Sequence, residues 1–300
     1  MNPALVQGRV SAFWNSSPCD SDLSDRDRNS REYYLDIERA RYSLQAHIPE
    51  IIARIDWRGK RVLEIGAGVG TDARRLIAAG AIYTGINVDR ASTAEAARAL
   101  QIFALPGTVL QCDATSLDFA DNSFDIVYSF GVLHHIPEVE KAVAEIHRVL
   151  KPGGLVLAML YNRSSINYRI EIMFLRRLGL RLLDLPGAIA VLDWLGLPRE
   201  KLERHKALHE RYGKSSTGHW LGRNTNGPDN PYAQVYDAKR VRTLFKAFRI
   251  ESEEICFFDH RHWGVLGRLL PRSLRLALGR RWGWHRIVCA AKHARGRCAR

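Results

Sequence analysis

Apolar residues follow two patterns along this chain, and the change from one to the other outlines its elements. Short continuous apolar runs predict buried strands, whereas apolar residues three and four positions apart predict helices. The predicted strands are Arg61–Ile65, Ile82–Val88, Val109–Cys112, Asp125–Phe130 and Leu155–Tyr161, and the predicted helices between them are Thr71–Ala79, Ala91–Phe103 and Val139–Leu150. This alternation predicts an α/β fold, in which a parallel sheet carries helices on both faces through right-handed crossovers.

The patterning changes on either side of this core. Residues 1–30 are polar and predict a loose lead-in, followed by a helix over Ser30–Arg54 that Pro49 interrupts. The later predictions are helices at Ile166–Leu197, Arg199–Tyr212 and Asp237–Phe248, an irregular loop at Ser215–Tyr236, strands at Arg249–Phe258 and Arg286–Lys292, and a disordered basic tail at His293–Arg300. The chain therefore divides into a lead-in and helical cap (1–58), a core (59–161), a helical insertion (162–235), a segment completing the sheet (236–292) and a tail (293–300).

Three glycines at alternate positions follow the first predicted strand of the core. Gly66, Gly68 and Gly70 permit positive φ and bring backbone close to a ligand, and the next helix begins directly after them. Strand, glycine turn and helix together predict a nucleotide-binding corner. Glu64 lies inside the apolar run before the turn, where a carboxylate needs a partner. A ligand hydroxyl or ammonium group would be one, and a purely structural role is the alternative.

Charge is distributed unevenly over the 300 residues. The formal net charge is +13, yet residues 1–160 carry 17 Lys and Arg against 20 Asp and Glu, whereas residues 161–300 carry 28 against 12. The basic character therefore belongs to the second half. An acidic substrate, a nucleic acid or an anionic membrane surface would each account for it.

The five cysteines are scattered and include no Cys-x-x-Cys pair, which argues against a disulfide framework or a zinc site. The pair His260 and His262 has no cysteine or carboxylate cluster beside it, so no metal is expected there. Residues 1–15 lack the apolar core of a signal peptide, and no apolar run reaches a membrane span. We therefore expect a soluble, cytoplasmic protein, with peripheral contact to an anionic membrane as an option for residues 169–181.

Five motifs of the core occur in an order that resembles one family, the class I S-adenosylmethionine-dependent methyltransferases, in their small-molecule methyltransferase-domain branch. The motifs are residues 63–71 (LEIGAGVGT), 85–89 (GINVD), 112–114 (CDA), 123–135 (SFDIVYSFGVLHH) and 150–154 (LKPGG). The resemblance covers residues 59–161, with weaker support from 236–292. It implies a Rossmann-like, doubly wound, seven-stranded, mostly parallel sheet with a helical lid, and a ligand at the carboxyl ends of the strands.

The resemblance also implies S-adenosyl-L-methionine as cofactor and assigns its contacts. The glycine loop, with Ala67, would wrap the methionine part, and Glu64 would contact it directly or through water. Asp113 would accept a hydrogen bond from the adenine amino group beside the Ala114 N–H, unless it only caps its loop. Phe130 would line the adenine or methyl region, with a core role as the alternative.

The main departure from the family pattern lies at the end of the second strand, Asn87-Val88-Asp89. The family has an acidic residue at the position of Asn87, where it binds both ribose hydroxyls. An amide offers one acceptor and a donor in place of two charge-assisted acceptors, at a cost of about 1 kcal/mol. Asp89 lies two residues on, on the same side of an extended strand, and is the alternative partner.

Methyl transfer from a sulfonium depends mainly on positioning, and a base is needed only when the acceptor loses a proton. His134 and His135, just past the fourth strand, are the candidate bases, with His135 favoured by family position. Packing is the alternative role for both. Tyr161, at the end of the fifth strand, would bind substrate, help the base or pack against the lid.

The resemblance places the acceptor site under residues 162–235, whose apolar content predicts a small or lipid-like acceptor methylated at oxygen, nitrogen or carbon. Two other functions remain open. The basic second half suggests a nucleic-acid-directed methyltransferase, although the strand-four exit lacks an Asp/Asn-Pro-Pro-aromatic motif and no RNA-binding module is recognisable. Asn87 suggests a non-catalytic relative that binds the cofactor weakly. The acceptor and the oligomeric state are not specified by the sequence.

Overall fold

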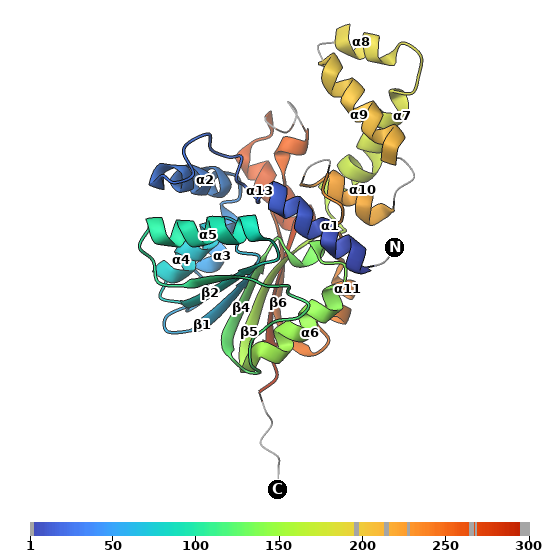
Figure 1. Cartoon of the computed structure of the whole chain (residues 1–300). Helices are drawn as coiled ribbons and strands as arrows, with labels where there is room; N and C mark the ends of the chain where they lie inside the picture. Colours follow the sequence, from blue (N-terminus) through green and yellow to red (C-terminus); the bar gives the residue numbers. More distant parts are fainter. Residues whose placement is uncertain are drawn as a thin grey trace.

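A computed structural model describes residues 3–194, 198–212, 216–226, 229–263, 267 and 269–294. A seven-stranded sheet with the order β3-β2-β1-β4-β5-β7-β6 forms its centre (Figure 1). The strands are β1 (Arg61–Ile65), β2 (Ile82–Asn87), β3 (Thr108–Gln111), β4 (Phe124–Phe130), β5 (Leu150–Tyr161), β6 (Phe248–Cys256) and β7 (His285–Lys292). Strand β7 runs in the direction opposite to the other six strands. The predicted doubly wound, mostly parallel sheet is therefore confirmed.

Helices cover both faces of this sheet. They are α1 (Pro3–Ser16), α2 (Arg31–Leu44), α3 (His47–Ile52), α4 (Thr71–Ala78), α5 (Arg90–Ile102), α6 (Val139–Val149), α7 (Arg176–Leu182), α8 (Ala188–Trp194), α9 (Arg199–Tyr212), α10 (Thr217–Arg223), α11 (Ala238–Leu244) and α13 (Arg272–Trp282), with the short helices η1 (Leu133–His135), η2 (Asn167–Leu175) and η3 (His260–Trp263). Buried residues of α3 and α4 pack on one face, and those of α6 and α11 on the other.

Two long segments leave the sheet at the same edge. Tyr161, the last residue of β5, pairs with His285, the first residue of β7, and His285 also pairs with Cys256 at the end of β6. Residues 162–235 and the β6–β7 connection (257–284) therefore both start from the carboxyl edge of the parallel strands. Within the first, residues 167–194 and 198–212 form an arm that projects beyond the sheet (Figure 1).

The first thirty residues differ from the predicted loose lead-in, because residues 3–16 form α1. Val6 and Val10 are buried against the core, and the Ser11 hydroxyl donates to the carbonyl of Val88, 3.3 Å away. The spacing of Val6, Val10 and Trp14 places them on one helix face, which is the signal that the polar composition obscured. The helix forms because this narrow face docks on the domain.

Three other predicted elements are divided differently in the structure. The predicted helix Ser30–Arg54 is two helices that part at residues 45–46, because Pro49 lies in the first turn of α3, where its missing N–H costs nothing. The predicted helix Ile166–Leu197 is η2, α7 and α8, with residues 195–197 outside the described part. The predicted loop Ser215–Tyr236 contains α10, which Ser216 caps by accepting from the His219 N–H. Most of the basic tail also lies outside the described residues.

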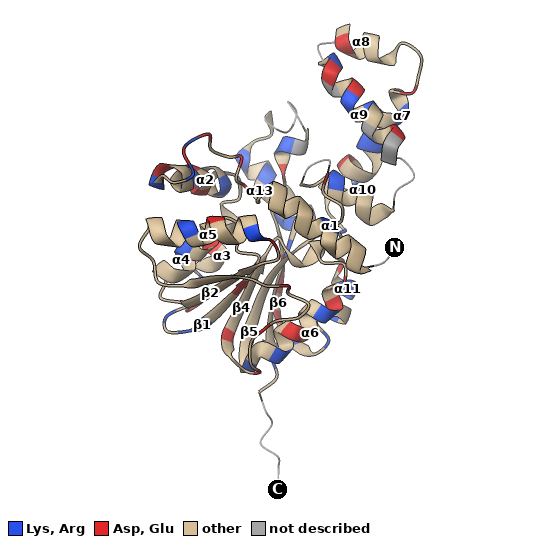
Figure 2. Ribbon diagram, viewed as in Figure 1, with Lys and Arg blue, Asp and Glu red and all other residues tan. Residues whose placement is uncertain are grey.

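The arm differs from the core in its surface. Acidic and basic residues are interspersed along α9 (Figure 2), as in the sequence REKLERHKALHERY. Helices α7 and α8 of the same arm contain no buried residue, unlike α4 and α6, which pack on the sheet. No helix in the described residues is both long and apolar enough to cross a bilayer.

The half-buried His47 and the buried His285 join α3 to the sheet beneath Phe130. His47 Nε2 lies 2.9 Å from His285 Nδ1, and both rings contact the Phe130 ring. Burial, aided by the nearby positive charge of Arg41, lowers the pKa of His47 to about 4. Burial and the neighbouring His47 hold the pKa of His285 well below its usual range. Both side chains are therefore neutral in the folded protein at pH 7.

This pair predicts a loss of stability in acid. Below pH 6.5 the unfolded chain binds a proton at His47 that the folded protein refuses until about pH 4, so the unfolding free energy falls as the pH falls through that window. We expect His47→Gln to remove about 2 kcal/mol of the loss between pH 7 and pH 5. Urea unfolding of both proteins at the two pH values measures this; equal losses would contradict the assignment.

Candidate functional site

The glycine loop after β1 lies close to the end of β2 and to the segment that follows β4. Gly66, Gly68 and Gly70 all have positive φ, at 78°, 54° and 81°. A Cβ atom at Gly66 would lie 2.1 Å from a methyl carbon of Val132, at the exit of β4. The N–H groups of Gly66 and Ala67 donate to the carbonyl of Ile86 at the end of β2. The loop therefore draws the ends of β1, β2 and β4 together.

A cavity lies at this junction. Its walls are the glycine loop, the ends of β2 and β4, η1 and one side of α1. Of the residues predicted for the site, those that line it are Glu64, Gly66, Ala67, Gly68, Asn87, Val88, Asp89, Ala114, Phe130 and His135. Four other predicted site residues do not line it: Gly70, Asp113, His134 and Tyr161.

One end of the cavity holds the carboxylate singled out from the apolar run. Glu64 is 3% exposed, and Oε2 accepts a 2.6 Å hydrogen bond from the Tyr83 hydroxyl. Burial, and then the negative charge of Asp72, raise the pKa of Glu64 to about 8. The carboxylate has found a partner inside the protein, but the partner does not offset the cost of its charge. A cation bound here would do so.

Asp72, the second carboxylate at this end, is fully bonded. Arg41 Nη2 donates to its Oδ2 at 3.0 Å, Tyr128 donates to the same oxygen at 2.9 Å, and Tyr42 donates to Oδ1 at 2.8 Å. Arg41 also bonds Asp20, 2.7 Å away, so it joins α2, α4 and the loop before α2. Arg41 lines the cavity, and its Nε is buried with no hydrogen-bond partner among the described residues. That donor is available to an anionic group of a ligand.

The side chain of Asn87 braces the glycine loop. Its Oδ1 accepts from the Gly68 N–H at 2.9 Å, and its Nδ2 donates to the Gly68 carbonyl at 3.3 Å. Each amide atom retains one further hydrogen-bonding position. Asp89 caps α5 by accepting from the Ser92 N–H at 2.7 Å. Asn87 therefore keeps one acceptor and one donor for a ligand, and Asp89, which also lines the cavity, uses only Oδ1 for its helix cap.

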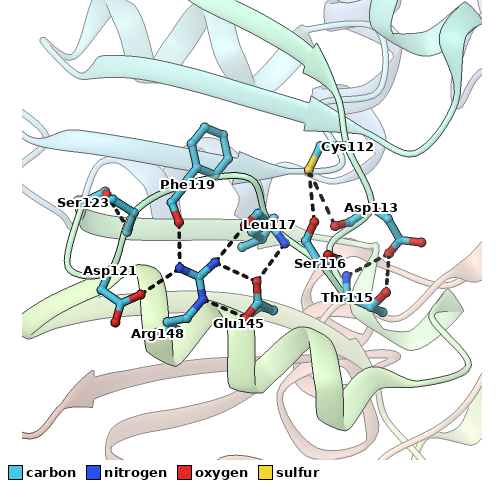
Figure 3. A network of polar contacts seen from close by, with 11 residues as sticks. Cys112, Asp113, Thr115, Ser116, Leu117, Phe119, Asp121, Ser123, Glu145 and Arg148 are labelled. Atoms are coloured by element: carbon cyan, nitrogen blue, oxygen red, sulfur yellow. Dashed lines mark hydrogen bonds and ion pairs between the residues drawn. The ribbon is translucent and has the colours of Figure 1, made fainter.

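Asp113 lies in the loop between β3 and β4, which a dense network holds on α6 (Figure 3). The Arg148 guanidinium donates to the carbonyls of Leu117 and Phe119 and forms a two-point ion pair with Glu145. Glu145 in turn accepts from the Leu117 N–H. Surface ion pairs are individually weak, but a connected set that satisfies backbone groups fixes a loop. This clamp determines where Asp113 can point.

Asp113 Oδ1 accepts from both the N–H and the hydroxyl of Thr115 at 2.8 Å, and its Oδ2 accepts from Gln7 Nε2 of α1 at 2.9 Å. Gln7 and Trp14 line the cavity, and the Trp14 ring meets His135 edge-on. Helix α1 was absent from the predicted site. It forms one wall of the cavity and is anchored to a predicted site residue.

The two histidines after β4 have different environments. His135 Nδ1 is 2.8 Å from the carbonyl of Tyr232, so it carries the proton, and its Nε2 accepts from Asn226 Nδ2 at 2.8 Å. Burial lowers the pKa of His135 to about 4. His134 instead stacks on Tyr161, with ring centroids 3.6 Å apart, and Tyr161 stacks on Trp284. Only His135 presents a ring to the cavity.

Asn226 links His135 to Tyr161, whose hydroxyl donates to Asn226 Oδ1 at 3.1 Å. No local motif pointed to Asn226, because it lies in the insertion more than 90 positions from His135. Its position depends on the insertion folding back over the carboxyl edge, where the Tyr236 N–H donates to the carbonyl of Tyr161.

Comparisons with known proteins agree with the geometry. Residues 63–158 match a family model described as a methyltransferase domain. The sterol 24-C-methyltransferase ERG6B of Gibberella zeae is 38% identical over 100 residues, which are 32% of this chain and 26% of that protein. The fatty-acid O-methyltransferase of Mycolicibacterium smegmatis is 36% identical over 122 residues, 40% of this chain and 43% of that protein. The chain spans less than half the length of these relatives.

The fold is similar to that of magnesium protoporphyrin IX methyltransferase (ChlM) from Synechocystis PCC 6803 with bound SAH. That structure aligns with a TM-score of 0.53 over 96% of this chain and 99% of its own, at 15% identity. At this identity the likeness concerns the fold. It extends beyond the matched core to the strands after residue 236.

The buried carboxyl group of Glu64 predicts a pH-dependent effect of its removal. Between pH 4.5 and about pH 8 the folded protein holds a proton that the unfolded chain has lost, so ionisation of Glu64 lowers the unfolding free energy as the pH rises. We expect the stability of Glu64→Gln relative to the wild type to rise by about 2 kcal/mol from pH 6 to pH 8. Urea unfolding without ligand measures it, and a pH-independent difference would contradict the shift.

Proposed function

We propose that this chain, whose residues 63–158 form a class I S-adenosylmethionine-dependent methyltransferase domain, transfers a methyl group from S-adenosyl-L-methionine to a small or lipid-like acceptor. The observation that carries the proposal is the cavity at the carboxyl ends of β1, β2 and β4. It combines a glycine loop, buried acidic groups and a neutral histidine in one enclosed space.

The polar groups of the cavity suit the cofactor. The buried, unpartnered Nε of Arg41 would bind the methionine carboxylate, and Glu64 would bind the ammonium group, which would offset the cost of its charge. Asn87 would offer its remaining acceptor and donor to the ribose. Ala114, which lines the cavity, would contact adenine, and Asp113 would accept from the adenine amino group in place of the Gln7 amide. Gly66 and Gly68 would leave room for the methionine part, with Gly70 completing the turn.

When bound, S-adenosylmethionine supplies a methyl group on a sulfonium, which needs no further activation. The work of the protein is then to orient the acceptor and, where the acceptor carries a proton, to remove it. His135 is suited to that task because it is neutral and its Nδ1–H is held by Tyr232, which leaves the lone pair on Nε2. An acceptor O–H or N–H can replace the Asn226 amide as the donor to this lone pair.

Asn226 would therefore hold His135 in one tautomer until the acceptor arrives. Tyr161 would position Asn226 through its hydroxyl, and His134 would support Tyr161 by stacking. In this assignment His135 is the catalytic residue, whereas Tyr161 and His134 are positioning residues.

The acceptor class follows from the insertion and from the relatives. Residues 162–235 leave the carboxyl edge and include an arm with exposed apolar side chains. The relatives above are named for sterol and fatty-acid acceptors. A small or lipid-like acceptor is the common description. Cys19, Cys112, Cys256 and Cys289 are free thiols, which suits a reducing compartment, and we place the protein in the cytoplasm on that basis.

Cofactor binding tests the first step of the proposal. In calorimetry with S-adenosylhomocysteine, we expect Asp113→Ala to weaken binding roughly 10- to 100-fold through loss of a charged acceptor. Gly68→Val should also weaken binding, because a β-branched residue is strained at a φ of 54°. Gln7→Ala is the matched control, since it removes the α1 contact but keeps the carboxylate. Equal losses in the Asp113 and Gln7 variants would mean that Asp113 only anchors α1.

The absence of wild-type binding at millimolar S-adenosylhomocysteine would overturn the enzyme proposal in favour of a non-catalytic relative. A salt-dependent mobility shift with RNA or DNA at physiological ionic strength would favour a nucleic-acid substrate instead.

Turnover with an identified acceptor tests the role of His135. We expect His135→Ala to keep S-adenosylhomocysteine affinity and to lower kcat about 10²- to 10⁴-fold for an acceptor that must lose a proton. His147→Gln is the control, because His147, on α6, packs against Phe248 and does not line the cavity. Unchanged turnover in His135→Ala would remove the base assignment while leaving the cofactor site intact. Acceptors are found by a cofactor-consumption screen over sterols, fatty acids and small metabolites.

A further inference from the structure

Exposed apolar side chains are concentrated in two segments of this protein. Sixteen large apolar side chains are exposed in the part of the chain that the structure describes, and twelve of them belong to the arm and to the β6–β7 connection. The arm contributes Ile170, Phe174, Leu175, Leu178, Leu182, Leu185, Val191 and Trp194, and the β6–β7 connection contributes Leu269, Leu274, Leu276 and Trp282. Trp194 is the most exposed of them, with 84% of its surface in contact with solvent.

Both segments lie at the edge of the sheet that holds the cavity. They leave it at Tyr161 and Cys256, each of which pairs with His285. Their bases also touch, because Asn167 Nδ2 of η2 donates to the carbonyl of Asp259, 2.9 Å away. The exposed apolar residues therefore gather on the side of the domain where a ligand reaches the carboxyl ends of the strands.

The β6–β7 connection is far longer than the sheet requires. Two antiparallel neighbours can be joined by a two-residue turn, whereas residues 257–284 intervene here. Its helix α13 packs on β6 through Gly279, where an added Cβ would lie 3.1 Å from the backbone nitrogen of Phe257. Leu274 and Leu276 remain 44% and 52% exposed. The helix thus buries one side and leaves leucines in water.

The part of the connection that follows Asp259 carries charge of one sign. No acidic residue follows Asp259, whereas 11 lysines and arginines do. Arg272, Arg280 and Arg281 are exposed on α13, and the Arg281 guanidinium lies 5.2 Å from the centroid of the Trp282 ring. Exposed Leu and Trp beside Arg, with no acidic residue, are typical of helices that lie in the interface of an anionic bilayer.

We propose that the exposed apolar residues of the arm and of α13, together with Arg272, Arg280 and Arg281, form a docking surface for an anionic lipid bilayer. Apolar side chains enter the headgroup region while the arginines pair with lipid phosphates. A second copy of the chain is a poorer occupant, because a symmetric contact would place the same acid-free helix against itself. The surface is independent of methyl transfer, and its test needs neither cofactor nor acceptor.

Vesicle flotation tests the docking surface. We expect the full chain to float with vesicles of phosphatidylcholine and phosphatidylglycerol, to bind pure phosphatidylcholine weakly, and to be released by added salt. In the triple variant Arg272→Gln, Arg280→Gln and Arg281→Gln, each lost arginine should lower the partition coefficient about fivefold. Leu274→Glu with Leu276→Glu should lower it by at least as much, because the apolar contacts are replaced by repelled charges.

Leu110→Glu is the matched control for the leucine variants. Leu110 is 42% exposed on β3, at the far edge of the sheet from β6, and its substitution should leave flotation unchanged. Absence of flotation with anionic vesicles at low salt would overturn the proposal, as would unchanged flotation of the triple arginine variant. A concentration-dependent dimer that Leu276→Glu disperses, without flotation, would assign the surface to a second copy. Calorimetry with S-adenosylhomocysteine measures cofactor binding, so it tests the methyltransferase proposal independently of vesicle binding.

Discussion

The close approach of Gly66 to Val132 is the contact on which the rest of the site depends. No side chain fits at position 66, because its first carbon would lie 2.1 Å from a Val132 methyl carbon. The same residue donates its N–H to the carbonyl of Ile86. One glycine therefore joins the exits of three parallel strands, and the cavity exists because these exits meet. The position of His135, three residues beyond Val132, follows from the same contact.

Electrostatics then determines what the cavity favours. Asp72 pairs with Arg41 and accepts from two tyrosine hydroxyls, whereas the one hydrogen-bond partner of Glu64 among the described residues is the Tyr83 hydroxyl. Burial raises the pKa of Glu64 to about 8. A site with one satisfied and one costly carboxyl group gains most from a cationic ligand that also carries an anionic group for Arg41. This balance is a physical reason to expect an amino acid moiety next to the glycine loop.

The elements of the core were predictable because their signals are local. Continuous apolar runs identified β1, β2 and β4 to within a residue or two, and the Pro-Gly-Gly after α6 marked its end. The predicted β5 was too short at its start, since pairing with β4 extends it back to Leu150 through an irregular register. Helix α1 was missed because its apolar residues are spread around the helix, and only two of the fourteen residues, Val6 and Val10, are buried.

Some features of the candidate site were likewise predictable from local sequence, and others were not. The sequence predicted that the glycine loop, Glu64, Asn87 and Ala114 lie together, and they line one cavity, because short motifs at strand ends meet at one edge of any parallel sheet. The separate environments of His134 and His135, the bracing of Gly68 by Asn87, and the contacts of Gln7 and Asn226 were not predicted. Each of these depends on how a side chain from a distant segment packs, with 91 positions between His135 and Asn226.

The sequence alone therefore determined the sheet, the cofactor corner and the uneven charge, since periodicity, glycine conformation and composition are properties of the local chain. Only the tertiary structure decided which histidine faces the cavity, what closes it, and where the apolar arm and α13 lie relative to it. The reason is that burial and hydrogen-bond partners are set by contacts between segments, and local sequence does not encode the geometry of those contacts.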